Sequence, residues 1–183
     1  MEFVRTEISD VFICKPKIFG DERGYFCETF KKKELESFLG KQINFCQDNE
    51  AKSSLNVLRG LHYQLPPYAQ TKLVRVIKGR VLDIVVDIRK NSPTFGEHIS
   101  VELSAENKLQ LFVPKGFAHG YVTLEEGTIF SYKVDNYYSK EAERGIMYND
   151  SSLNIKWGAV ETSFLISEKD KLQPNFINAE VFE

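Results

Sequence analysis

The stretch VLDIVVDIR, from Val81 to Arg89, alternates so regularly that it predicts a β-strand with two different faces. One face is entirely aliphatic, and we expect it to pack into a core; its members are Leu82, Ile84, Val86 and Ile88. The other face mixes carboxylates with valine, as expected of a surface that lines a polar cavity; its members are Val81, Asp83, Val85, Asp87 and Arg89. The fold must therefore place this strand between a core and a cavity.

Short strands separated by turn residues continue from about residue 43 to 137, a pattern typical of an all-β sandwich or barrel. Turn signals occur at NSP (91–93), SAEN (104–107), PKG (114–116) and EEG (125–127). Helical periodicity is confined to about 31–39, where Gly40 marks the end, and to the C-terminal region around 167–173. We expect one domain over 1–183, with a barrel core at about 43–137, an N-terminal strand arm at about 1–30 and a C-terminal helical segment at about 160–183.

Composition argues against several classes of function. Lys plus Arg number 24 and Asp plus Glu number 26, so nothing indicates a nucleic-acid partner. No apolar run approaches the length of a membrane span, and the N-terminus does not resemble a signal peptide. The three cysteines, Cys14, Cys27 and Cys46, match no metal-ligand spacing. We expect a soluble cytoplasmic protein with reduced thiols and no membrane partner.

NVLRGLHYQ (56–64) places a histidine in a stretch that otherwise resembles a buried strand. In a regular strand His62 and Gly60 share one face and Arg59 points the other way. A bulge at Gly60 would instead bring Arg59 and His62 into one cavity. On the residues alone, a hydrogen-bonded core histidine is the commoner outcome, so both interpretations stay open.

Other candidate residues also have a structural and a functional interpretation. Lys72 lies on an apolar-flanked face, so it is either a strand-end lysine that reaches water or a cation with an anionic partner in a cavity. His119 follows a Pro-Lys-Gly turn and begins a strand. Tyr132, between Phe130 and Val134 on one face, is typical of a core tyrosine.

Two half-motifs, GLHYQ and VPKGFAHG, resemble those of the cupin barrel. A larger set closely resembles the dTDP-4-dehydrorhamnose 3,5-epimerases, in order and spacing, from about Val11 to Asp170; it includes FGDERGYFCETF, FCQDNEAKS, VLRGLHYQ, QTKLVRVIKGRVLDIVVDIRKNSPTFG, LSAENKLQLFVPKGFAHGY, YKVDNYYS and ISEKD. The resemblance implies an all-β, cupin-type jelly-roll barrel with a few short peripheral helices. It also implies an enzyme without a metal or cofactor.

Such an enzyme inverts carbons 3 and 5 of dTDP-4-dehydro-6-deoxy-D-glucose and yields dTDP-4-dehydro-L-rhamnose. Because both carbons neighbour the 4-ketone, the chemistry needs a base, a group that stabilises the enolate and an acid on the opposite face. On the matching positions, His62 is the base and Asp170 the carboxylate that orients it. Tyr132 is the acid and Lys72 the cation at the 4-oxygen.

The resemblance also implies a set of substrate-binding residues. Arg59 matches a contact to the diphosphate, and Tyr138 matches a ring that stacks on thymine. The remaining binding positions are Arg23, Glu28, Gln47, Asn49, Lys72, His119, Glu143 and Lys169. The family's N-terminal segment, which carries Arg23 and Glu28 here, reaches the neighbouring subunit's site, so the resemblance implies a homodimer.

Three alternatives remain at this point. The same motifs would serve a related dTDP-4-keto-6-deoxy sugar, or inversion at one carbon only. A metal-dependent cupin generally needs His-x-His on its first strand, but the pair here is His62 and Gln64, and glutamine is a poor ligand for Fe, Zn or Ni. A sugar-nucleotide-binding protein without catalysis would not need His62, Asp170 and Tyr132 together.

Overall fold

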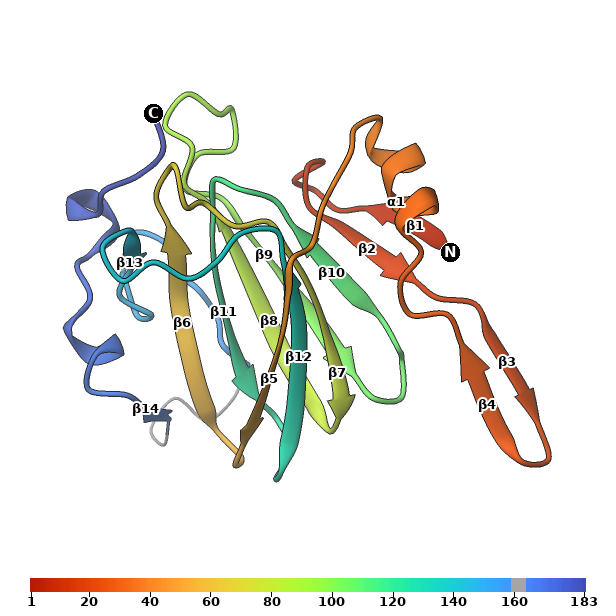
Figure 1. Ribbon diagram of the computed structural model, residues 1–183. Helices are drawn as coiled ribbons and strands as arrows, with labels where there is room; N and C mark the ends of the chain where they lie inside the picture. The colour runs from red at the N-terminus through yellow and green to blue at the C-terminus, as the bar shows by residue number, and fades with distance from the viewer. Residues whose placement is uncertain (159–163) are drawn as a thin grey trace.

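The computed structural model describes residues 1–158 and 164–183, and two β-sheets that face each other form its body (Figure 1). The first sheet has six strands in the order β1 (Glu2–Arg5), β2 (Phe12–Lys15), β10 (Gln110–Val113), β7 (Lys72–Lys78), β12 (Thr128–Val134) and β5 (Gln47–Ser53). The second has the order β13 (Glu143–Gly145), β6 (Val57–Gln64), β11 (Phe117–Thr123), β8 (Arg80–Asp87) and β9 (His98–Ser104). The predicted all-β barrel is confirmed.

The strand β8 has the two faces that its alternation predicted. Val81 and Val85 pack in the cluster between the two sheets, beside residues of the first sheet such as Val74 and Phe130. Ile84 and its same-face neighbours pack in a second cluster against the C-terminal part of the chain. Both faces of β8 are therefore buried, and only the face inside the barrel carries carboxylates.

The N-terminal thirty residues divide between the barrel and an arm. β1 and β2 pair with each other, and β2 pairs with β10, so the first sheet includes strands from well before residue 43. Only the hairpin of β3 (Ile18–Asp21) and β4 (Gly24–Cys27) projects from the body in Figure 1. The projecting part is thus shorter than the arm we expected over residues 1–30.

Helices are few and peripheral. The helix α1 (Lys32–Leu39) ends at Gly40, which has a φ of 66° and donates its N–H to Glu36. Leu35 of α1 is buried in a third cluster together with Phe12 and Phe112, on the outer side of the first sheet. Across the described ranges, no helix has the length and apolar character needed to cross a bilayer.

The C-terminal segment runs beside β6 and the second sheet (Figure 1). It contains the short strand β14 (Leu165–Ile166), which pairs in parallel with β6, and two short 3-10 helices, η2 (Asp170–Leu172) and η3 (Phe176–Asn178). The predicted helical segment is therefore limited to these 3-10 turns within 164–183, and its first residues, 160–163, lie outside the described residues.

Candidate active site

One extra residue in β6 decides which of its side chains face the barrel interior. His119 of β11 pairs with His62, whereas Tyr121 pairs with Arg59, so two steps along β11 span three steps along β6. Gly60 lies in this irregularity with a φ of 133°, a conformation that favours glycine. As a result Arg59 and His62 line the same cavity, which is the bulge alternative left open by the sequence.

The cavity has a volume of about 560 Å³ and a mixed lining. Its walls come from both sheets and from the C-terminal segment up to the first residue of η2. The lining residues are Ala51, Val57, Leu58, Arg59, His62, Lys72, His119, Tyr121, Phe130, Tyr132, Leu165, Ile166, Ser167, Lys169 and Asp170. All four predicted catalytic residues are among them, although His62 and Asp170 lie 108 positions apart in the chain.

His62 and Asp170 form a close pair. His62 Nε2 donates to Asp170 Oδ1 at 2.6 Å, and the Asp170 residue is only 3% exposed. Burial acts to raise the pKa of Asp170, but the net effect holds this pKa below its usual range. The opposing contributions are the hydrogen bond and charge of His62 and the hydrogen bonds from Gly60 and Ser167. Because Nε2 is committed to the carboxylate, Nδ1 is the ring nitrogen left to accept a proton.

A second histidine–carboxylate pair lies within the barrel. His119 Nε2 is 2.9 Å from each carboxylate oxygen of Asp83, which is fully buried. Burial raises the pKa of Asp83, while His119 and Lys72 act in the opposite direction. Burial also lowers the pKa of Lys72 to about 8, against the opposing charges of Asp83 and Glu143. The site therefore holds a lysine that gives up its proton more readily than a surface lysine.

Tyr132 belongs to an aromatic group contributed by the first sheet and β11. Its ring centroid lies 6.1 Å from that of Phe130, and Phe130 stacks on Tyr121 with centroids 4.0 Å apart. Burial raises the pKa of Tyr132, although the charge of Arg59 opposes this rise. Tyr132 is thus a neutral phenol at ordinary pH in a largely apolar part of the cavity.

Four predicted binding residues are outside the cavity lining but connect to it through Lys169 or through β5; they are Gln47, Asn49, Tyr138 and Glu143. Tyr138 donates its hydroxyl hydrogen to Glu143 Oε2 at 2.8 Å, and Lys169 forms an ion pair with Glu143 Oε1 at 2.5 Å. Gln47 Nε2 donates to Asn49 Oδ1 at 2.7 Å. The exposure of β5 alternates, and these two residues share their strand face with Ala51, which lines the cavity.

Arg23 and Glu28 do not join the other predicted residues in this chain. Arg23 lies at the tip of the β3–β4 hairpin and pairs with Asp21, and its side chain is 84% exposed. Glu28 pairs with Lys31 just before α1. Neither contributes to the cavity lining.

The structure adds residues that sequence reasoning had not placed in the site. Asp83 was expected on a cavity face, but its pairing with His119 was not foreseen. Tyr121 shares a strand face with His119, and this period-two relation could have identified it. Ser53, which contacts Arg59, carries no signal in the sequence that sets it apart from other strand serines.

Comparison with known proteins assigns the chain to a family. The sequence model of the family described as dTDP-4-dehydrorhamnose 3,5-epimerase matches residues 5–178. A relative of that name from Shigella flexneri is 53% identical over 182 residues, which cover 100% of this chain and 99% of the relative. The chain belongs to the dTDP-4-dehydrorhamnose 3,5-epimerase family. The resemblance found in the sequence motifs is thereby confirmed.

Solved structures of the epimerase family share the same fold. The dTDP-4-dehydrorhamnose 3,5-epimerase from Elizabethkingia anophelis NUHP1 superposes with a TM-score of 0.94 at 50% identity, covering 97% of each chain. The dTDP-6-deoxy-D-glucose-3,5-epimerase from Legionella pneumophila Philadelphia 1, in complex with dTDP-4-keto-L-rhamnose, gives 0.93 at 45% identity and covers 97% of this chain and 93% of that one. Within residues 1–158 and 164–183, no three His, Cys, Asp or Glu side chains are arranged to hold a metal ion.

Proposed function

We propose that this chain inverts carbons 3 and 5 of dTDP-4-dehydro-6-deoxy-D-glucose to give dTDP-4-dehydro-L-rhamnose. Family membership supports the substrate class. The observation that carries the mechanism is the His62–Asp170 pair, which shares one cavity with Lys72 and Tyr132. This arrangement supplies a base, a cation and an acid, the three groups that proton exchange next to a ketone requires.

His62 removes the proton. Carbons 3 and 5 both flank the 4-ketone, so loss of either proton gives an enolate whose charge resides largely on the 4-oxygen. Asp170 holds the His62 ring and stabilises the imidazolium that forms. Lys72, with a pKa of about 8, is mostly protonated at neutral pH and stabilises the enolate oxygen, and His119 contacts the same part of the substrate.

Tyr132 delivers the proton on the opposite face of the sugar. Its phenol starts protonated because burial raises its pKa. Transfer from the hydroxyl to the enolate carbon forms the new C–H bond and leaves a phenolate, which the nearby positive charge of Arg59 helps to stabilise.

The rest of the cavity binds the nucleotide. Arg59 contacts the diphosphate, and the exposed ring of Tyr138 stacks on thymine. Gln47, Asn49, Lys72, Glu143 and Lys169 complete the binding set within one chain.

The active form is a homodimer in the cytoplasm, and the reaction uses no metal or cofactor. The β3–β4 hairpin carries Arg23 and Glu28 to the partner's cavity. Its exposed apolar side chains support this assembly, because such a surface on a projecting hairpin is suited to a protein partner; they are Ile18, Phe19, Tyr25 and Phe26, all at least 47% exposed.

Hydrogen exchange tests this proposal. In D₂O with dTDP-4-dehydro-6-deoxy-D-glucose, the wild-type protein should exchange two carbon-bound hydrogens, followed by mass spectrometry and NMR. His62→Ala should exchange neither while still binding dTDP. The matched control is His98→Ala, which removes a histidine outside the cavity lining and should retain exchange. Exchange at one carbon only would indicate a mono-epimerase, and normal exchange by His62→Ala would rule out His62 as the base.

A further inference from the structure

Ser53 holds the guanidinium of Arg59. Both Arg59 Nε and Arg59 Nη2 lie 3.2 Å from Ser53 Oγ and donate to it. Ser53 is the last residue of β5 and is 6% exposed, whereas Arg59 belongs to β6 in the other sheet. The contact therefore spans the two sheets where β5 and β6 converge (Figure 1).

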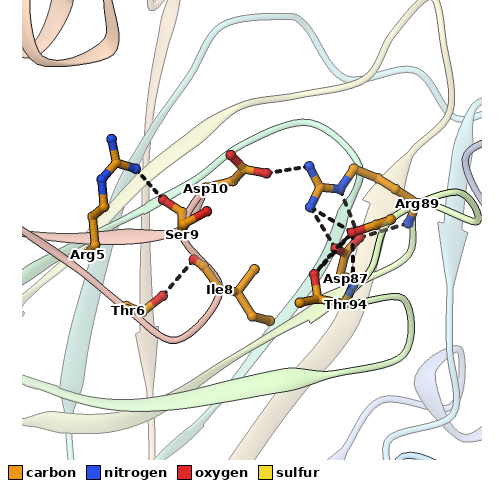
Figure 2. Close-up of polar contacts among 9 residues, drawn as sticks. Arg5, Thr6, Ile8, Ser9, Asp10, Asp87, Arg89 and Thr94 are labelled. Carbon is orange, nitrogen blue, oxygen red and sulfur yellow. Dashed lines mark hydrogen bonds and ion pairs between the residues drawn. The ribbon is translucent and has the colours of Figure 1, made fainter.

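This anchor is uncharged, in contrast to the two carboxylates that hold Arg89. Figure 2 shows Arg89 bound to Asp87 and Asp10, so that two carboxylates neutralise its charge. Within the described ranges, Arg59 has neither an ion pair nor a hydrogen bond to any side chain except Ser53. Its positive charge stays available to a ligand in the cavity.

The geometry also leaves the outer edge of the guanidinium free. A guanidinium has five N–H donors, and Ser53 engages one on Nε and one on Nη2. The three that remain lie on Nη1 and Nη2, the edge that binds two phosphate oxygens side by side.

We propose that Ser53 is a positioning residue that holds Arg59 with this free edge toward the diphosphate of the substrate. The proposal rests on the diphosphate contact of Arg59 in the proposed function. A hydroxyl suits this task because it fixes the guanidinium without cancelling its charge, as a carboxylate would. An ordered guanidinium also loses less side-chain entropy when the ligand binds.

A double-mutant cycle on dTDP binding and epimerase kinetics tests the role. Ser53→Ala should weaken dTDP binding and raise KM by roughly 3- to 10-fold. The kcat should be nearly unchanged, because a less ordered Arg59 guanidinium weakens binding of the substrate and of the transition state to the same extent. In an Arg59→Ala background the same change should cause no further loss. Ser53→Cys, which keeps the size but accepts hydrogen bonds poorly, should reproduce Ser53→Ala, and Ser53→Thr should restore affinity.

The control is Ser104→Ala, an equally buried strand-end serine that contacts Asn107 and lies outside the cavity lining. It should leave dTDP affinity unchanged. If Ser53→Ala lowers dTDP affinity equally in the wild-type and Arg59→Ala backgrounds, or lowers it in neither, the positioning role is wrong. The proposed function would remain intact. If Arg59→Ala alone binds dTDP like the wild type, the diphosphate contact itself is wrong.

Discussion

Lys72 is a partly buried lysine that gives up its proton more readily than a surface lysine. Burial lowers its pKa to about 8, so the charged form that we propose stabilises the enolate is lost as pH rises through this value. We therefore expect kcat to fall above about pH 8 in a pH–rate profile. Lys72→Met should lower kcat by about 10²–10³ and flatten this alkaline limb. A wild-type profile that stays level to pH 10 would show that the Lys72 charge is not needed.

At the residue scale, the proposed mechanism assigns proton removal to His62 and proton delivery to Tyr132, and a single variant can separate the two roles. Tyr132→Phe deletes one hydroxyl and keeps the packing on Phe130. We expect the variant to exchange substrate hydrogens with D₂O through His62 but to form much less inverted product, measured by NMR. Equal loss of exchange and inversion would instead assign Tyr132 to proton removal, and full inversion would make it an ordinary core tyrosine.

At the scale of elements, the turn after β8 depends on one buried carboxylate. Asp87 accepts hydrogen bonds from Arg89 and Thr94, and Arg89 also binds Asp10 (Figure 2). Asp87 accepts a further hydrogen bond from the hydroxyl of Ser92. Burial acts to raise the pKa of Asp87, but these hydrogen bonds lower it to about 2. The resulting stabilisation is present above the unfolded-state pKa of about 4 and disappears as pH falls through about 2.

Asp87→Asn should consequently reduce the free energy of unfolding by about 3 kcal/mol near neutral pH, because it leaves the Arg89 charge with a weaker partner. Urea unfolding between pH 7 and 2 checks this, and the variant should lose less stability on acidification than the wild type. Glu183→Gln, which breaks an exposed pair with Lys90, is the control and should cost less than about 1 kcal/mol. Similar stability of the two variants would contradict the role assigned to Asp87.

The elements also show what could be predicted from the sequence. The alternation of β8 and the helix ending at Gly40 follow from side-chain periodicity, so both were predictable. The bulge in β6 was not, because it depends on the pairing with β11. Likewise, no local pattern indicates that Asp170 meets His62; only the family resemblance linked them, since the contact arises from how the C-terminal segment packs on the second sheet.

For the whole molecule, the important question is whether two chains share each cavity. If the β3–β4 hairpin crosses to the partner, Arg23→Ala and His62→Ala should each be poorly active alone. After subunit exchange, half of the dimers are mixed, and each mixed dimer has one complete site, so activity should recover to about a quarter of the wild-type value.

The control for this mixing experiment pairs His62→Ala with Asp170→Asn. Both changes lie in the same chain's cavity, so no combination of subunits rebuilds a complete site. Recovery in the first mixture alone would support the shared site. No recovery in mixtures that demonstrably contain mixed dimers would place Arg23 outside the partner's cavity.

The bulge at Gly60 places the backbone of this residue against that of Gly120 in β11, and this contact limits which amino acids either position can accept. A Cβ on Gly60 would lie 2.5 Å from Gly120 Cα, and one on Gly120 would lie 2.8 Å from the Arg59 carbonyl oxygen. Every other amino acid carries that atom, so no substitution at either position preserves the spacing between the strands that hold His62 and His119. In a saturation-mutagenesis library selected for activity, both codons should remain glycine, whereas neighbouring apolar positions should accept substitutions. The two glycines would then be invariant because their backbones are in contact, and not because either residue binds a ligand.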